Sequence, residues 1–252
     1  MIAHTSPKTS KAEKKVLTFY KEDPREVPVY TLTQTARYLK IPVVTLKTWV
    51  KGREYPVEGG KRKFFKPVIL LPNPRMPRLS FMNLVEAHVL NGIRRIENIP
   101  FRKVRQAIEY LEKQYPSKHP LADRLFQTDG VDLLIEDLDK LINVSRHGQI
   151  EMREVVKKYL RRIERDPTKH LPIRLYPFLR NTHQVEEPIS VVIDPLVSFG
   201  RPTLVKTGIP TAVIAERFYA GDSTHDLARD YGIEREKIEE AVRYEAPYLK
   251  AA

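Results

Sequence analysis

The sequence predicts a mainly helical protein with short β-hairpins: a winged helix-turn-helix unit, a helical middle and a second helix-turn-helix-like unit. Three observations lead to this fold class. Apolar residues recur at helical spacing in several segments between residues 30 and 245. Gly-Gly and Asp-Gly pairs lie between short runs of strand-forming residues, as in hairpins. A length of 252 residues and a hydrophobic content of 41% suit two modest globular domains.

Composition narrows the possible functions. The chain has no cysteine, which excludes disulfides and thiolate metal sites. No run approaches about 18 apolar residues, and the opening MIAHTSPKTSKAEKK lacks the apolar stretch of a signal peptide, so we expect a soluble, cytoplasmic protein. The net charge of +12 is uneven, because residues 1–120 hold 24 basic and 10 acidic residues whereas residues 121–252 hold 20 and 22. A basic first half predicts a polyanionic partner, with nucleic acid first.

The first ordered unit is predicted to follow a basic, proline-containing arm. Thr33 is a suitable N-cap for a short helix through residue 40. A second short helix over residues 43–51 would bury Leu46 and Trp49 and end at Gly52, which gives a helix-turn-helix. Residues 55–57 and 61–65 flank a Gly-Gly pair, which predicts a hairpin, and a hairpin in this place is a wing.

The middle of the chain is predicted to be helical with one hairpin. Ser80 caps one long helix, and Pro100 starts another whose apolar residues share one side. Residues 124–131 contain Asp129-Gly130 between apolar residues, which predicts a strand, a turn and a strand. A helix over about 152–165 follows, and residues 166–188 carry four prolines, which indicates a linker with an extended segment.

The last block is predicted to be a second helix-turn-helix shape after a strand over residues 189–193. Thr211 caps a helix to residue 220, Ser223 caps residues 224–231, and residues 235–244 form the final helix. The predicted organisation is therefore a flexible basic arm (1–28), a winged helix-turn-helix domain (29–78), a helical middle domain with a β-hairpin (79–165), a linker (166–188), a second helix-turn-helix-like helical domain (189–245) and a tail (246–252).

The predicted DNA-reading surface combines the second helix of the first unit with the wing. Short polar groups on that helix can reach base edges, while lysines and arginines neutralise phosphates. The candidate DNA-binding residues are Thr45, Lys47, Thr48, Lys51, Arg53, Lys61, Arg62, Lys63 and Lys66. The alternative is a surface helix that is merely basic. Pro42 stands where a capping side chain is usual, so this helix lacks one.

The second helix-turn-helix carries the opposite charge. Residues 234–245 hold five glutamates against three basic residues, which would repel phosphates and favour a protein partner. The candidate partner-binding residues are Phe218, Tyr219, Glu234, Glu236, Glu239, Glu240 and Tyr244. The alternative is that these glutamates only solvate a helix and the middle domain binds the partner.

Signals for catalysis, metals or cofactors are poor, so we predict neither an enzyme nor a cofactor site. The seven histidines show no metal-binding spacing, and His88, on an apolar helix face, is expected in the core. Asp132, Glu136, Asp137 and Asp139 crowd together, which strand alternation and a following loop explain as a solvated edge. Tyr176 and Phe178 could stack on bases, although packing explains them better.

Two stretches resemble known families. The segment TLTQTARYLKIPVVTLKTWV with its wing resembles the winged helix-turn-helix of MerR-like regulators. Residues 189–245 resemble the small helical domain of unknown-function antitoxins. The matching residues are Asp194, Pro195, Gly200, Pro202, Thr207, Ile209, Pro210, Gly221, Ser223, Leu227, Ala228, Tyr231, Ala241 and Tyr244. Lys206 and Gly208 stand where that pattern has glycine and arginine, so no role of that arginine carries over.

The middle stretch, with LSFMNLVEAHVL, is similar to longer members that join both ends, namely VapB-type antitoxins of type II toxin–antitoxin systems. This resemblance covers residues 30–245. It implies a repressor of its own operon that binds operator DNA and neutralises a PIN-like ribonuclease toxin, and by analogy a homodimer. The alternative is a stand-alone MerR-like regulator that senses a small ligand in a pocket of the middle domain.

Overall fold

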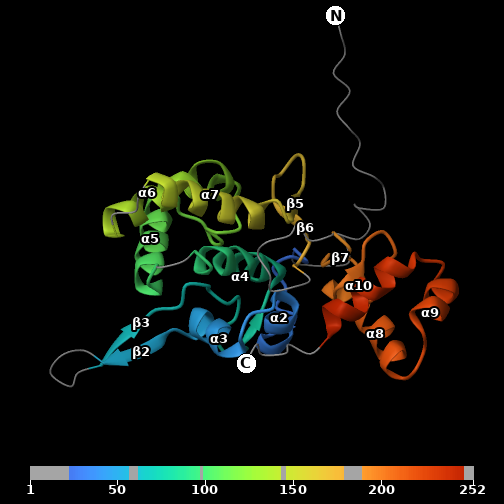
Figure 1. Ribbon diagram of the computed structural model, residues 1–252. Coiled ribbons are helices and arrows are strands. Elements are labelled where there is room, and N and C mark those ends of the chain that lie inside the picture. The colour runs from blue at the N-terminus through green and yellow to red at the C-terminus, as the bar shows by residue number, and fades with distance from the viewer. Residues whose placement is uncertain (1–22, 57–61, 97–98, 143–145, 179–188, 247–252) are drawn as a thin grey trace, which may run out of the picture.

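The computed structural model describes residues 23–56, 62–96, 99–142, 146–178 and 189–246 (Figure 1). Helices dominate, and the described strands form two-stranded antiparallel sheets. Helix α4, Phe81–Arg94, is the central element: almost all of its residues are buried, and it lies between the winged unit and the remaining helices of the middle. One hydrophobic core runs through both, from Tyr30 to Ile193, so the winged unit and the middle are packed as one body.

The first unit has the predicted winged helix-turn-helix arrangement. Helices α2 and α3 pack together, strands β2 and β3 form the wing, and β1 pairs with β4 beside them. The bounds are β1 Tyr30–Thr31, α2 Leu32–Leu39, α3 Val43–Lys51, β2 Arg53–Pro56, β3 Arg62–Phe65 and β4 Arg78–Leu79. The predicted turn residues 57–61, Lys61 among them, lie outside the described residues.

The cap of α2 differs from the prediction. Thr31, not Thr33, is the N-cap: its Oγ1 accepts a hydrogen bond from the Gln34 amide at 3.2 Å, and Gln34 Oε1 accepts one from the Thr31 amide at 3.0 Å. This reciprocal capping box needs a Glu or Gln three residues after the cap, which Thr31 has and Thr33 lacks. Helix α3 has the predicted bounds, and Pro42 supplies no capping side chain.

The middle unit is helical with a hairpin at its end. Ser80 is the N-cap of α4, as predicted. The elements are α5 Phe101–Gln114, a π-helical turn Phe126–Gly130, α6 Val131–Ile142, α7 Arg146–Leu160, β5 Ile163–Arg165 and β6 Pro172–Leu175. Helix α7 ends before the predicted residue 165, because Ile163 pairs with Leu175 in the β5–β6 hairpin. The extended segment predicted within 166–188 is β6, whereas 179–188 lie outside the described residues.

The hairpin predicted at residues 124–131 is wrong. Phe126–Gly130 is a π-helical turn that leads directly into α6. The apolar residues that follow have helical spacing, and Val131, Leu134, Ile135 and Leu138 are all buried. The Asp129-Gly130 pair therefore lies inside a helical segment, and the core prevails over the local turn signal.

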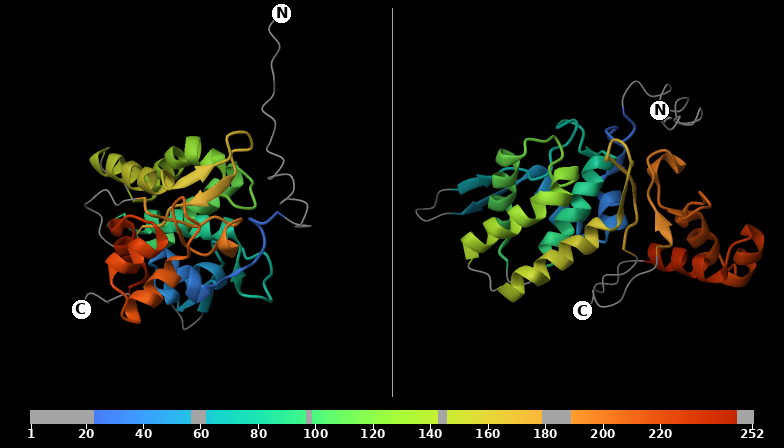
Figure 2. Two further views of the ribbon diagram at one scale, coloured as in Figure 1. Left: turned by 90° about the vertical axis from the view of Figure 1, so that its right-hand side faces the viewer. Right: turned by 90° about the horizontal axis from the view of Figure 1, so that it is seen from above.

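The C-terminal unit lies to one side of this body (Figures 1 and 2). It has a small core of its own, which includes Leu204, Ile214 and Leu227. Its elements are β7 Val191–Val192, a 3-10 turn Ser198–Gly200, β8 Thr203–Leu204, α8 Thr211–Tyr219, α9 Thr224–Tyr231 and α10 Arg235–Glu245. Ser223 caps α9 as predicted. Thr211 is the first residue of α8 rather than its cap, because its hydroxyl donates to Glu245.

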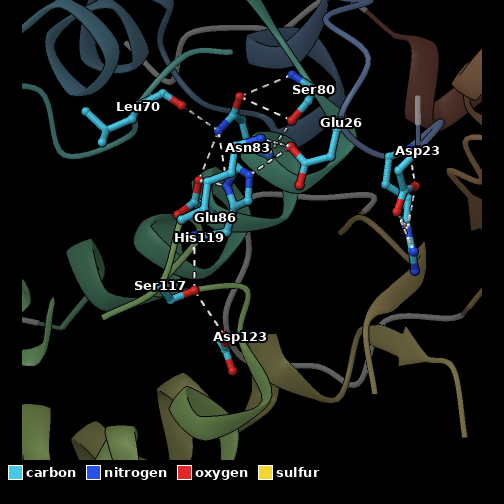
Figure 3. A network of polar contacts seen from close by, with 11 residues as sticks. Asp23, Glu26, Leu70, Ser80, Asn83, Glu86, Ser117, His119 and Asp123 are labelled. Carbon is cyan, nitrogen blue, oxygen red and sulfur yellow. Dashed lines mark hydrogen bonds and ion pairs between the residues drawn. The ribbon is translucent and has the colours of Figure 1, made fainter. Parts of the chain in front are cut away.

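A buried polar network fixes the start of α4 to the surrounding chain (Figure 3). His119 contacts Glu86 through Nδ1 at 2.9 Å and Glu26 through Nε2 at 3.1 Å. Asn83 donates to Glu86 at 3.0 Å and to the carbonyl of Leu70, on the segment that leaves the wing, at 3.0 Å. The network thus connects the chain before the winged unit, the end of the wing and the loop after α5.

Among the described residues, no helix is long and apolar enough to cross a membrane.

Candidate nucleic-acid interface

Buried side chains on the inner face of helix α3 anchor it to the rest of the protein. Leu46 and Trp49 are buried, and the Trp49 ring stacks on Phe101 of α5 with centroids 6.2 Å apart. The Trp49 carbonyl also accepts hydrogen bonds from the amides of Val68 and Ile69 at 2.8 and 3.1 Å, beyond the wing. The predicted anchors are therefore correct, and they tie α3 to both the helical body and the chain that leaves the wing.

The outward face of α3 contains three of the predicted residues and one that sequence reasoning missed. Lys47 and Lys51 are exposed, and Thr48 lies between them, half-buried, with its hydroxyl donating to the Val44 carbonyl at 2.9 Å. Val44 itself is 77% exposed. Its spacing to Lys47, Thr48 and Lys51 could have identified it, because residues three, four and seven apart share a helix face. Thr45 is half-buried at the edge of this face.

The two faces of the wing are not equivalent. Tyr55 pairs with Lys63 and Arg53 with Phe65, so these four side chains share one face of the β2–β3 hairpin. On this face Arg53 and Lys63 are exposed. Arg62 lies on the opposite face, where it forms an ion pair with Glu54 at 3.1 Å. The predicted trio of wing cations is thus divided: Lys63 is available with Arg53, Arg62 is partly neutralised, and Lys61 is outside the described residues.

Aromatic stacking holds the base of the wing. The rings of Tyr55 and Phe65 stack with centroids 3.9 Å apart, and the Arg105 guanidinium lies 5.2 Å from the centre of the Phe65 ring. Arg105 also donates to the carbonyl of Lys66, whose own side chain is exposed. Gly52 joins α3 to the wing with φ +74°, and a Cβ there would lie 2.2 Å from the Phe65 carbonyl oxygen. Glycine is therefore required at this junction.

The predicted acidic surface of α10 is largely paired within its own helix. Arg235 binds Glu239 at 2.7 Å, Lys237 binds Glu234 at 2.9 Å, and Arg243 binds Glu240. Glu240 is also mostly covered, with a side chain that is 13% exposed. Glu234 and Glu236 remain exposed. The repulsion of phosphates predicted from composition is consequently weaker than a count of glutamates implies.

The three predicted aromatic anchors lie in different environments. Tyr219 is 59% exposed on α8 and meets Phe218 edge to face at 5.6 Å between centroids. Phe218 is half-buried and packs against the C-terminal core. Tyr244 is buried and cannot contact a partner, because its hydroxyl donates to the Tyr38 carbonyl of α2 at 3.0 Å. Of the three, only Tyr219 presents most of its ring.

Tyr244 instead joins the C-terminal unit to the helix-turn-helix. The Lys40 amine lies 4.5 Å from the centre of the Tyr244 ring and donates to the Tyr244 carbonyl. Burial lowers the pKa of Lys40 and raises the pKa of the Tyr244 phenol, since each charged form is costly to desolvate. Nearby, Arg37 lies 3.9 Å from the Glu245 carboxylate. The C-terminal unit therefore rests on the end of α2 and leaves the outward face of α3 open.

The remaining candidates are structural. His88 is in the core as predicted, and its Nε2 lies 3.0 Å from the Tyr159 carbonyl oxygen. Burial lowers the pKa of His88 to about 3, so the ring is neutral at pH 7. Phe178 is half-buried and stacks on the buried His88 at 5.7 Å between centroids, so its ring packs against the core. The acidic residues at 132–139 lie on α6, not on a strand edge, because that segment is helical. The described residues contain no group of three potential metal ligands.

Family models match both the N-terminal and the C-terminal part of the chain. Residues 28–108 match the family described as "Putative DNA-binding HTH domain", and residues 191–244 match "Protein of unknown function (DUF433)". The chain is 30% identical over 233 residues to "Putative antitoxin VapB45" of Mycobacterium tuberculosis, across 86% of this chain and 93% of that protein. It is 26% identical over 240 residues to "Uncharacterized protein Rv2308" of the same organism, across 88% of this chain and 92% of that protein.

A crystal structure has a similar fold. The structure of Rv2018 from Mycobacterium tuberculosis superimposes with a TM-score of 0.59 and 24% identity, and the match covers 86% of this chain and 98% of that chain. The predicted mainly helical fold with an N-terminal helix-turn-helix is confirmed. The helix-turn-helix family match continues through α4 into α5, in agreement with the core that the winged unit shares with these helices.

Proposed function

The chain belongs to the family of the antitoxin VapB45, and on that premise we propose that it is the antitoxin of a type II toxin–antitoxin pair. In this proposal it binds operator DNA through α3 and the wing, represses its own operon, and neutralises a PIN-like ribonuclease toxin through its C-terminal unit. Such a role is that of a binding protein and needs no catalytic residues. One observation carries the proposal: the same chain contains a match to a helix-turn-helix family and is similar to "Putative antitoxin VapB45" over 86% of its length.

The shape and charge of the α3–wing surface support DNA binding. Val44, Lys47, Thr48 and Lys51 form one outward-facing stripe, with Thr48 half-buried, on a firmly anchored helix, which is the geometry of a recognition helix in a major groove. The valine methyls can contact a thymine methyl, and the threonine hydroxyl can reach base edges or phosphates. Lys47, Lys51, Arg53, Lys63 and Lys66 are the exposed cations of this surface outside the Arg62–Glu54 pair. Five phosphate contacts would give a salt slope of about −4.5.

A binding titration with the full chain separates affinity from sequence preference. The probes are a duplex from upstream of the gene and a shuffled duplex of equal length, each measured over a range of salt. Lys63→Ala with Lys66→Ala should weaken binding to both and reduce the salt slope by about 1.8. Thr45→Ala with Thr48→Ala, or Val44→Ala alone, should chiefly reduce the preference for the upstream duplex.

Lys113→Ala, an exposed lysine near the end of α5, is the matched control and should leave both properties unchanged. If the wing pair and the α3 variants act alike, or if neither differs from Lys113→Ala, the assignment of the reading surface is wrong.

The toxin-binding part of the proposal rests on Tyr219 and the exposed acids of α10. Tyr219 is a large, mostly exposed ring on a folded helix, the kind of residue that dominates binding energy when a partner covers it. A ribonuclease must attract RNA, so its active-site face is expected to be basic. The exposed Glu236 offers the complementary charge, together with Glu234, which is partly neutralised by Lys237. The alternative is that the helical middle binds the toxin.

Point variants of the full chain test this better than truncations. A cut near residue 180 would remove Ile193 from its pairing with Leu175, and Tyr244 from Tyr38, so a truncated body would lose core contacts. Tyr219→Ala should weaken toxin binding by roughly 2 kcal/mol, or about thirtyfold. Phe64→Ala, which removes a ring of similar exposure from the wing, is the control and should bind toxin normally. If Tyr219→Ala and Phe64→Ala bind the toxin with equal affinity, the toxin-binding surface does not include Tyr219 and lies elsewhere on the chain.

We also propose a homodimer, because operators with two-fold symmetry match dimeric proteins. Light scattering of the purified chain should give twice the mass of one 29.3 kDa chain. A monomer at the concentrations at which the chain binds the upstream duplex would contradict this.

A further inference from the structure

A cleft of about 510 Å³ lies beside the junction of the β5–β6 hairpin with the strand–turn region of the C-terminal unit, where Leu175 pairs with Ile193. Its lining includes Glu164, Arg174 and Tyr176 of the hairpin and Asp194, Thr203 and Lys206 of the C-terminal unit. Its size is within the range of small-molecule sites, and such sites are frequent where two structural units meet. None of these residues belongs to the α3–wing surface or to the exposed face of α8.

The anionic groups of the cleft already have partners. Arg174 binds Asp194 through Nε at 2.9 Å and Glu164 through Nη1 at 2.8 Å. The second oxygen of Asp194 accepts the Leu196 amide at 2.8 Å, and the second oxygen of Glu164 accepts the Tyr176 hydroxyl. Both carboxylates are therefore occupied, and they hold Arg174 in a fixed position on the wall.

Lys206 differs from these residues, because its ammonium group makes no hydrogen bond or ion pair within the described part of the chain. Its backbone is left-handed, with φ +67°, at the third position of a turn closed by the Thr207 amide and the Leu204 carbonyl at 3.1 Å. Glycine or asparagine is usual at such a position, and a lysine there is strained. Strained backbone of this kind is enriched at functional sites.

The non-polar part of the lining includes Val192, Val197, Leu204 and Val205, of which Val197 and Val205 are half-buried and the other two are buried beneath them. An apolar floor with one uncommitted cation at the rim suits a ligand with an apolar body and a single negative charge. Glu164 and Asp194 offset Arg174 and Lys206 in charge, which disfavours a dianion such as a phosphate monoester.

We propose that this cleft binds a small monocarboxylic acid, with the ligand carboxylate on Lys206 and its apolar body against the valines. This goes beyond the antitoxin role and is independent of it. Because residues of the β5–β6 hairpin and of the C-terminal unit both line the cleft, a bound acid would contact both.

The test uses the full chain and titration calorimetry with hexanoate and phenylacetate as probes. Each should bind saturably with one molecule per chain, and the matched amides, hexanamide and phenylacetamide, should bind at least tenfold more weakly. Replacing Lys206 removes a charge-assisted hydrogen bond to the ligand. Lys206→Gln should therefore lower the affinity for hexanoate and for phenylacetate by about tenfold. The control is Lys113→Gln, which replaces an exposed lysine on α5 and should leave the affinities unchanged.

A second variant tests the location. Val205→Trp should fill the cleft and abolish binding, with a circular dichroism spectrum unchanged from the parent as the check of folding. The proposal is overturned if neither acid binds saturably, if acids and amides bind equally, or if Lys206→Gln behaves like Lys113→Gln. It is overturned as well if phenyl phosphate binds more tightly than phenylacetate, because the site would then be a phosphate site.

Discussion

Replacing His119 with glutamine should destabilise the protein by about 3–5 kcal/mol, because it leaves a buried carboxylate without its cationic partner. Both ring nitrogens of His119 face carboxyl groups, Glu86 at 2.9 Å and Glu26 at 3.1 Å, and a doubly protonated ring donates to both. Burial raises the pKa of Glu86 and so opposes its charged form, whereas the contact with His119 favours the carboxylate, and we expect the charged pair. Glu86 has a side chain that is 2% exposed, and among the described residues it keeps only the Asn83 amide as a hydrogen-bond donor when His119 is removed.

The same contact makes stability depend on pH. Burial alone would lower the pKa of His119, but its hydrogen bonds to Glu86 and the charges of Glu86 and Glu26 raise it above the ordinary value. A raised pKa in the folded state means that the stabilisation is fully present below about pH 6.5 and is lost as the pH rises through the folded pKa. The parent protein should therefore lose up to about 1.4 kcal/mol per pH unit in that window. His119→Gln should lack this part of the slope.

Urea denaturation followed by the fluorescence of Trp49, the single tryptophan, measures both effects at pH 6 and pH 8.5. Glu86→Gln is the matched variant, with an expected loss of about 1–2 kcal/mol, because the amide can still hydrogen-bond to its neighbours. The double variant, His119→Gln with Glu86→Gln, should lose less unfolding free energy than the two single variants together. The difference should be about 1–3 kcal/mol. Strictly additive losses, or a His119→Gln variant with the parent pH slope, would refute a buried imidazolium–carboxylate contact.

Three further predictions concern how the units are held. Trp49→Ala should cost about 3–5 kcal/mol in unfolding free energy and abolish DNA binding, as measured by denaturation and by titration, because α3 loses its anchor on Phe101. Tyr244→Phe should cost about 1–2 kcal/mol, because the Tyr38 carbonyl loses its donor, and hydrogen exchange should increase at the end of α2. Gly200→Ala should cost more than about 2 kcal/mol in urea denaturation, because φ is +73° and the new Cβ would lie 2.1 Å from the Tyr30 hydroxyl oxygen.

The local parts of the fold could be predicted from sequence, and the tertiary parts could not. Leu46 and Trp49 identified the inner face of α3, because helical spacing reports burial directly. The cap of α2 was misplaced by two residues, because Thr33 is also a good capping residue and only the reciprocal bond with Gln34 selects Thr31. At Asp129-Gly130 a strong local turn signal pointed the wrong way, because packing of α6 in the core decided the structure.

The candidate site shows the same limit. The exposure of Lys47 and Lys51 followed from the helix period, whereas the pairing of Arg62 with Glu54 depends on the register of the wing. Tyr244 was predicted, where exposed, as an anchor for a partner. Its burial results from the docking of α10 on α2, a contact between residues 206 positions apart that no periodicity reveals.

The most direct test of the antitoxin assignment is co-expression of the full chain with the product of the neighbouring gene, followed by affinity purification. The proposed function predicts that the two proteins co-purify in a fixed ratio, that cells survive the neighbouring protein only when this chain is present, and that Tyr219→Ala weakens both effects while Phe64→Ala does not. A neighbouring product that neither harms the cells nor co-purifies with this chain would contradict the assignment.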